Sequence, residues 1–147
     1  MRVNGDITLI GRHAVRIGDN VHIGAGAYFY ADGGLTIGDN THISRNLVIY
    51  TSGHDHGGTR LPYDESRTRN PVSIGRNVWI GMNVCIAPGS VIGDGAIVGL
   101  GTVVFGEVPP LAIIGASPWH QIGSRDPTHY ERLDAARQYG GVNGRRL

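Results

Sequence analysis

The chain has 147 residues, 24 of them glycine, and a formal net charge of +1. This is the length of one domain, and its single cysteine excludes an intramolecular disulfide and fits a reducing compartment. The small net charge argues against a nucleic-acid-binding protein, which normally concentrates basic residues on one face. Because the sequence shows neither a signal-peptide pattern nor a long apolar run, we expect a cytoplasmic protein without a membrane span.

Aliphatic or aromatic residues recur every six positions along most of the chain. The series comprises Ile17, Ile23, Phe29 and Leu35, then Ile37, Ile43 and Ile49, and after a gap Ile74, Ile80, Ile86, Ile92, Val98 and Val104. The next position is usually Gly or another small residue. A period of six fits neither a helix nor a long strand, but it fits very short strands joined by tight turns. No single repeat can bury its large residue alone, so the pattern predicts stacked coils around a continuous core.

The period fails between Ile49 and Ile74, where residues 55–71 are polar and rich in turn-forming residues. A long irregular loop inside a compact repeat domain usually has a function. This loop begins directly after His54, whose imidazole could serve as a general base near neutral pH. From the residues alone, His54 could equally be an ordinary turn residue at the start of a loop.

Several motifs resemble the hexapeptide signature of the left-handed β-helix acyltransferases. They are Ile74-Gly75-Arg76-Asn77-Val78-Trp79-Ile80-Gly81, Pro88-Gly89-Ser90-Val91-Ile92-Gly93 and the closing Val108-Pro109-Pro110. The resemblance implies an all-β, left-handed parallel β-helix over residues 1–123, with coils at about 17–34, 37–54, 74–91 and 92–109. Asp126-Pro127 at one end and Gly140-Gly141 at the other predict a short helix in the tail, residues 124–147.

The element Thr51-Ser52-Gly53-His54, the loop and the restart Val72-Ser73-Ile74-Gly75 are similar to the galactoside, maltose and nodulation-type sugar O-acetyltransferases. This resemblance implies acetyl transfer from acetyl-CoA to a hydroxyl of a sugar or glycan-type acceptor, with His54 as the general base. It also implies a homotrimer with active sites between neighbouring subunits. N-acetylation of an amino sugar on the same scaffold stays open.

The resemblance also implies which residues contact the acyl donor, acetyl-CoA. The backbone N–H of Met82 would stabilise the oxyanion that forms on the thioester carbonyl. Leu100 would contact the pantetheine, and Phe105 and Gly106 would contact CoA. Trp79 would either contact CoA or pack at a subunit interface. The family often has Lys at the position of Gly106. It also has Lys or Arg two residues after the Pro of a Gly-x-Pro motif, where this chain has Gly115-Ala116-Ser117-Pro118-Trp119-His120. His120 or one of the arginines Arg125, Arg145 and Arg146 would then contact the CoA phosphates.

On the acceptor side, Phe29-Tyr30-Ala31-Asp32 resembles the family's Phe-Tyr-Ala-Asn, so Tyr30 and Asp32 are candidate acceptor contacts. His56 is a third candidate, within the loop. Asp55 could orient His54 or simply be solvated. Asp32 could equally be a corner residue before two glycines.

The sequence argues against two other functions, a zinc enzyme and a non-catalytic scaffold. A zinc enzyme resembling the γ-type carbonic anhydrases needs three ligands that converge on one ion, whereas His22 and His42 fall on a different side of the predicted coil from His54, so we expect no metal. A non-catalytic β-helix scaffold would have no need of the combination of His54, the loop and Trp79. Cys85 has no histidine or cationic cluster beside it and is not expected to be a nucleophile.

Overall fold

The computed structural model describes residues 1–57, 59–115, 128, 132, 135 and 136. The chain divides into two units, Met1–Ala116 and Ser117–Leu147. The first unit is an all-β, left-handed parallel β-helix, which confirms the predicted fold class. The predicted boundary after residue 123 and most of the predicted C-terminal helix lie outside the described residues. Among the described residues, no helix has the length and apolar character needed to cross a membrane.

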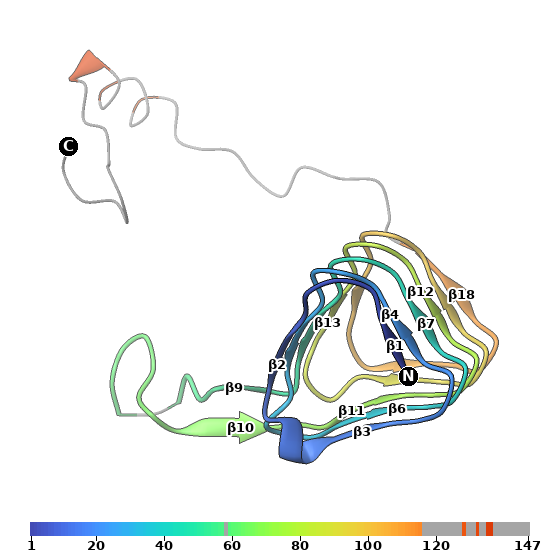
Figure 1. Ribbon diagram of the computed structural model, residues 1–147. Helices are drawn as coiled ribbons and strands as arrows, with labels where there is room; N and C mark the ends of the chain where they lie inside the picture. Colours follow the sequence, from blue (N-terminus) through green and yellow to red (C-terminus); the bar gives the residue numbers. More distant parts are fainter. Residues whose placement is uncertain (58, 116–127, 129–131, 133–134, 137–147) are drawn as a thin grey trace. The chain divides into compact units, whose positions relative to one another are not determined.

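Three parallel sheets form the three faces of a triangular coil (Figure 1). Face A contains β1 (Arg2–Val3), β4 (His22–Ile23), β7 (His42–Ile43), β12 (Trp79–Ile80), β15 (Ile97–Val98) and β18 (Ile113–Ile114). Face B contains β2 (Thr8–Ile10), β5 (Tyr28–Tyr30), β8 (Val48–Tyr50), β13 (Cys85–Ile86) and β16 (Val103–Val104). Face C contains β3 (Val15–Ile17), β6 (Leu35–Ile37), β11 (Val72–Ile74), β14 (Val91–Ile92) and β17 (Glu107–Val108). A 3₁₀ helix, η1 (Arg12–Ala14), precedes β3.

The six-residue period arises because each face contributes one large core residue per coil, with a second buried residue two positions before it. On face A, Ile23 pairs with Ile43 and Ile43 with Ile80, and all three side chains are buried. On face B, Phe29 pairs with Ile49 and is also fully buried. Since a side chain points inward only at alternate positions of a strand, neighbouring residues face outward and are more exposed. The core is therefore a column of aliphatic layers along the axis of the coil.

Asparagines and glycines at the corners allow the tight turns between faces. Asn20, Asn40 and Asn77 adopt positive φ values of 54°, 57° and 56°, a left-handed conformation that Asn tolerates better than most residues. The side-chain amide of Asn20 donates a hydrogen bond of 3.0 Å to the side-chain oxygen of Asn40 in the next coil. At Gly81, a Cβ atom would lie 2.6 Å from the backbone N of Leu100. The glycine at that corner therefore permits two coils to stack closely.

Replacement of a core residue should be far more costly than replacement of an outward neighbour. Ile80→Ala is expected to lower the free energy of unfolding by about 2–5 kcal/mol, because Ile80 is fully buried and its loss leaves a cavity. Val91→Ala, at a residue that is 43 % exposed, should change it by about 0.5 kcal/mol or less. Urea titration of the two variants measures both values, and equal losses would contradict the assignment of the core.

The excursion loop, residues 55–71, leaves the coil at the corner between faces B and C without interrupting the sheets. Strand β6 on one side of the loop pairs directly with β11 on the other, with Leu35 opposite Val72 and Ile37 opposite Ile74. The two ends of the loop form a separate antiparallel pair, β9 (Ser52–His54) with β10 (Arg67–Arg69). We call this pair the hairpin, and it projects from the coil in Figure 1.

Candidate active site

His54 is the last residue of β9, where the chain leaves the coil for the loop. Its side chain is exposed, and its ring stacks on Tyr63 of the loop with a centroid separation of 3.8 Å and an interplanar angle of 13°. Both residues line a shallow cavity of about 350 Å³ together with Arg60, Leu61, Asp64 and Glu65. The structure therefore places the predicted base in an open pocket that a substrate could reach, with one ring face covered.

Asp64 and Glu65, two acidic residues of the loop, both interact with other residues of the loop. Asp64 accepts hydrogen bonds from the backbone N–H groups of Thr59 (2.7 Å) and Ser66 (2.9 Å) and from both hydroxyl groups. These bonds, led by that from the Ser66 hydroxyl, hold the pKa of the Asp64 carboxyl well below its usual value. Arg60 pairs with Glu65 and lowers the pKa of that carboxyl as well.

Asp55 and His56, the two residues that follow His54, both belong to the loop. Asp55 accepts a hydrogen bond of 2.8 Å from the backbone N–H of Gly57, so its carboxylate closes a turn within the loop. Among the described residues, neither a hydrogen bond nor an ion pair joins the side chains of Asp55 and His54, which leaves Asp55 without a visible orienting role. His56 is exposed in the loop.

Asp32 lies beside the hairpin, where four polar side chains meet, two from β10, one from β9 and one from the corner after β5. Its carboxylate accepts a hydrogen bond of 2.5 Å from the hydroxyl of Ser52. The Nε atoms of Arg67 and Arg69 each lie 3.9 Å from the other carboxylate oxygen. Arg67 also donates a hydrogen bond of 3.1 Å to the Ser52 hydroxyl. Asp32 is therefore the carboxylate that both arginines of β10 face.

Three tyrosines extend this cluster over the outer surface of face B. Tyr30 and Tyr50 stack with centroids 5.4 Å apart, and Tyr28 and Tyr50 with centroids 5.8 Å apart. A hydrogen bond between Tyr28 and Tyr50 raises the pKa of the Tyr28 phenol. The guanidinium of Arg67 lies 5.0 Å from the centre of the Tyr30 ring, within the range of a cation–π contact. Of the predicted acceptor contacts, Tyr30 and Asp32 thus lie in one cluster.

Arg67 and Arg69 were not among the predicted site residues. The only signal in the sequence is the alternation Arg67-Thr68-Arg69 just before the coil resumes. Such alternation places both arginines on one side of a strand, but the partner strand and its register become visible only in the structure.

Three predicted cofactor residues lie together at the corner between faces A and B. Trp79, Met82 and Leu100 line a mainly apolar cavity of about 410 Å³, which we call the groove. Their side chains are 58 %, 47 % and 69 % exposed, so the groove is open to a ligand. Phe105 is exposed as well, and Gly106 adopts a φ of 71°. His120 lies outside the described residues, so its predicted contact with the CoA phosphates stays a prediction.

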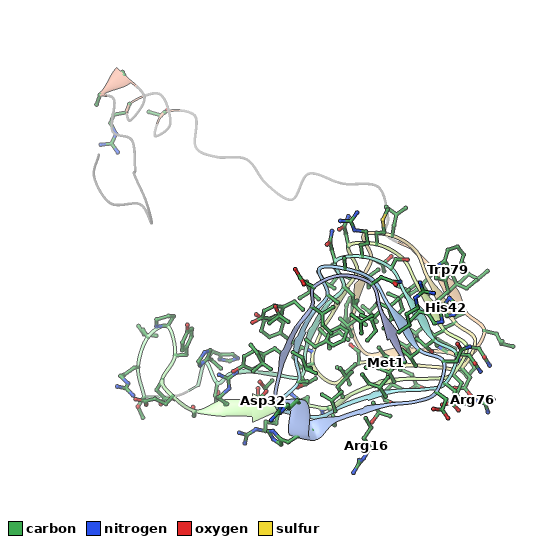
Figure 2. The ribbon with its side chains drawn as sticks, in the orientation of Figure 1. Met1, Arg16, Asp32, His42, Arg76 and Trp79 are labelled. Atoms are coloured by element: carbon green, nitrogen blue, oxygen red, sulfur yellow. The ribbon has the colours of Figure 1, made fainter. Side chains whose placement is uncertain are left out.

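The structure does not bring His54 and the groove together within one chain. The hairpin projects from the corner between faces B and C, whereas Trp79 belongs to face A. Figure 2 shows Asp32 and Trp79 on opposite sides of the coil. A site that uses both His54 and the groove therefore needs two chains.

The histidines in the described part of the chain do not form a cluster of metal ligands. Within the described residues, no group of three or more His, Cys, Asp or Glu side chains could hold a metal ion. His22 and His42 stack on the outer surface of face A with ring centroids 4.3 Å apart. Desolvation, followed by repulsion from His42 and Arg2, lowers the pKa of His22.

Two family models match the sequence, one on each side of the loop. The model described as bacterial transferase hexapeptide (six repeats) matches residues 71–106, and that of the hexapeptide repeat of succinyl-transferase matches residues 14–51. Repeat spacing, coil register and these matches together define a hexapeptide-repeat β-helix protein. The chain belongs to the hexapeptide-repeat acyltransferase family. No match was found among curated proteins.

Solved structures of similar fold include several acetyltransferases. A hexapeptide-repeat acetyltransferase from Vibrio cholerae is 30 % identical with a TM-score of 0.71, over 80 % of this chain and 66 % of that one. A maltose O-acetyltransferase from Clostridium difficile 630 is 30 % identical with a TM-score of 0.70, over 80 % and 63 %. The V. cholerae O1 biovar eltor acetyltransferase complexed with acetyl coenzyme A is 26 % identical with a TM-score of 0.69, over 86 % and 71 %. The chain thus spans slightly less than two thirds of the first two proteins.

Proposed function

We propose that this protein transfers an acetyl group from acetyl-CoA to a hydroxyl group of a sugar or glycan-type acceptor, with His54 as the general base. The observation that carries the proposal is the placement of His54, exposed at the mouth of the loop beside a polar and aromatic cluster. The similarity to a maltose O-acetyltransferase and to an acetyltransferase complexed with acetyl coenzyme A supports it.

The chemistry assigned to each residue follows from its atoms. The acceptor hydroxyl is a weak nucleophile, and His54 would take its proton as the oxygen attacks the thioester carbonyl. The backbone N–H of Met82 would donate to the oxyanion that forms on that carbonyl. Collapse of this intermediate would break the C–S bond and release CoA, whose thiolate would take the proton from His54. The apolar groove suits the pantetheine chain of acetyl-CoA, because Trp79, Met82 and Leu100 offer a partly exposed apolar surface.

The charges near His54 favour a hydroxyl acceptor over an amine. An amino sugar would need a free carboxylate to hold its ammonium group, and Asp32 is the candidate. Its carboxylate already faces Ser52, Arg67 and Arg69. Two guanidinium groups beside it would repel a cationic acceptor, so N-acetylation ranks second.

We further propose a homotrimer in which His54 of one subunit faces the groove of its neighbour. His54 and the groove are separated within one chain, and this separation supports an assembly in which they come from neighbouring subunits. Closed cyclic symmetry repeats the same contact and produces equivalent sites. A cytoplasmic location stays an expectation from the sequence.

An acceptor screen tests the proposed reaction. Purified protein is incubated with acetyl-CoA and panels of glycosides and amino sugars, while free thiol release is followed and the product is identified by mass spectrometry. We expect thiol release that depends on a glycoside and an O-acetyl product that is labile to mild base.

The same assay after EDTA dialysis separates this reaction from a zinc enzyme. Activity should persist, because acetyl transfer through His54 requires no metal ion. Base-stable N-acetyl products would favour the amine acceptor instead. Activity lost in EDTA and restored by zinc alone would favour the zinc enzyme, and thiol release that no acceptor increases would contradict the proposal.

A further inference from the structure

Positive charge exceeds negative charge in the cluster next to His54. Arg67 and Arg69 supply two guanidinium groups, and Asp32 is the carboxylate between them. Of the acidic residues in the His54 cavity, Glu65 pairs with Arg60, whereas Asp64 keeps its charge and accepts hydrogen bonds from neutral groups of the loop. Beside Arg67 and Arg69 themselves, where Asp32 is the one carboxylate paired with them over the residues that the structure describes, a bound acceptor would encounter more positive than negative charge.

The hydrogen-bonding capacity of the two arginines is only partly used. At 3.9 Å, neither Nε atom is close enough to hydrogen-bond the Asp32 carboxylate. The Nε of Arg67 is buried and has no hydrogen-bond partner among the described residues. The Arg69 side chain is 65 % exposed, and within that same part of the chain it makes no hydrogen bond. Arg69 can therefore present its planar guanidinium to an oxyanion in a two-point contact.

Strand register places these donors on the same side of the hairpin as the proposed base. Arg67 lies opposite His54, and Arg69 lies opposite Ser52. Residues two apart on a strand face the same side, and directly opposite pairs have Cβ atoms about 4.5–5.5 Å apart. A group held by Arg69 would thus lie within one sugar unit of the His54 imidazole. Tyr50, 41 % exposed, continues the surface beside it.

From this juxtaposition we propose that the acceptor is an anionic sugar, in which a carboxylate or phosphate binds Arg69 and Arg67 while a nearby hydroxyl faces His54. The inference deepens the proposed acetyl transfer and rests on it for the role of His54. The charge, the unused donors and the register point to the oxyanion, and either a uronic acid or a sugar phosphate supplies it.

Matched pairs of glycosides test the proposal. p-Nitrophenyl β-D-glucuronide is compared with p-nitrophenyl β-D-glucoside, and glucose 1-phosphate with methyl α-D-glucoside, in acetyl transfer and in direct binding measured by calorimetry. The full-length protein is used at low and high salt. We expect the anionic member of at least one pair to be preferred about 10- to 100-fold in kcat/KM and in affinity, because charge-assisted hydrogen bonds are the strong ones. The preference should shrink as salt is added.

Arg69→Gln should reduce the preference toward unity, and Arg69→Lys should retain part of it. The matched control is Arg16→Gln, which removes the same charge from the exposed surface of face C (Figure 2) and should leave the preference intact. Which pair shows the preference distinguishes a carboxylate from a phosphate.

The binding and turnover measurements distinguish a failure of the anionic acceptor from a failure of the proposed reaction. A preference in binding that Arg69→Gln abolishes, without turnover of any acceptor, would retain the anionic ligand and overturn the proposed reaction. Turnover of the neutral sugars with equal or better efficiency would retain the reaction and overturn the anionic acceptor. Absence of binding by every anionic sugar, or an equal loss in Arg16→Gln and Arg69→Gln, would also overturn it.

Discussion

His54→Ala is expected to lower the turnover number by about 10²–10⁴ while the Michaelis constant for acetyl-CoA stays nearly unchanged. The imidazole would act on the acceptor proton in the transition state and contribute little to binding of the donor. His54 is exposed and leaves no core cavity, and its stacking on Tyr63 is worth about 0.5–1.5 kcal/mol at most. Steady-state kinetics with the best acceptor, together with thermal unfolding, measure both effects.

His56→Ala is the control, since it removes the same side chain two residues further along the loop. We expect it to change mainly the Michaelis constant for the acceptor, if it changes anything. Retention of more than about half of the wild-type rate by His54→Ala would show that imidazole is not the base. The loop would then serve recognition alone.

Two inactive variants should restore activity when they assemble together. His54→Ala lacks the base, and Leu100→Glu places a negative charge in the groove, where Leu100 is 69 % exposed. If each site takes His54 from one subunit and the groove from the next, some sites in mixed trimers receive both intact parts. Random assembly gives about one quarter of such sites. We therefore expect about one quarter of wild-type activity after the two variants are unfolded and refolded together, against almost none for each alone.

A double variant that carries both substitutions on one chain is the control. Refolded with wild-type chains, it tests whether activity reflects the number of intact sites rather than recovery of folded protein. Light scattering on each sample should give the mass of a trimer. A fully active monomer, or a refolded mixture that stays inactive although trimeric, would contradict a site shared between subunits.

The fold was predictable because the repeat uses one rule in every coil. A large residue at each sixth position must point inward, as Ile43, Ile80 and Phe29 do. The sequence also shows the shift of two residues between Leu35 and Ile37. It arises because the corner between β5 and β6 is two residues longer than the corner between β13 and β14, counted between the last core residue of each strand. Leu35 then lies opposite Val72, and Ile37 lies opposite Ile74. The spacing of the large residues along the chain therefore also predicts which residues lie opposite each other in successive coils.

The surroundings of His54 were less predictable. The break in the period located the loop, but it carried no information on how residues within the loop pair. Antiparallel pairing of β9 with β10 brings Arg67 opposite His54 and Arg69 toward Asp32. That pairing depends on where the loop folds back, for which the sequence offers no regular signal. Asp32 was therefore predicted only as an acceptor contact or a corner residue, without its arginine partners, whereas the structure shows its carboxylate facing two of them.

Direct pairing of β6 with β11 beneath the loop has an evolutionary consequence. Leu35 and Val72 are neighbours in the sheet although 36 residues lie between them in the chain, so the ladder closes whatever the loop contains. Longer surface loops cost little extra chain entropy, about 0.6 kcal/mol for each doubling in length. Residues 55–71 can therefore be lengthened, shortened or exchanged between relatives without rebuilding the core. Under the proposed function, selection can thus change the acceptor preference in this segment while the coil, and the groove on its far side, stay the same.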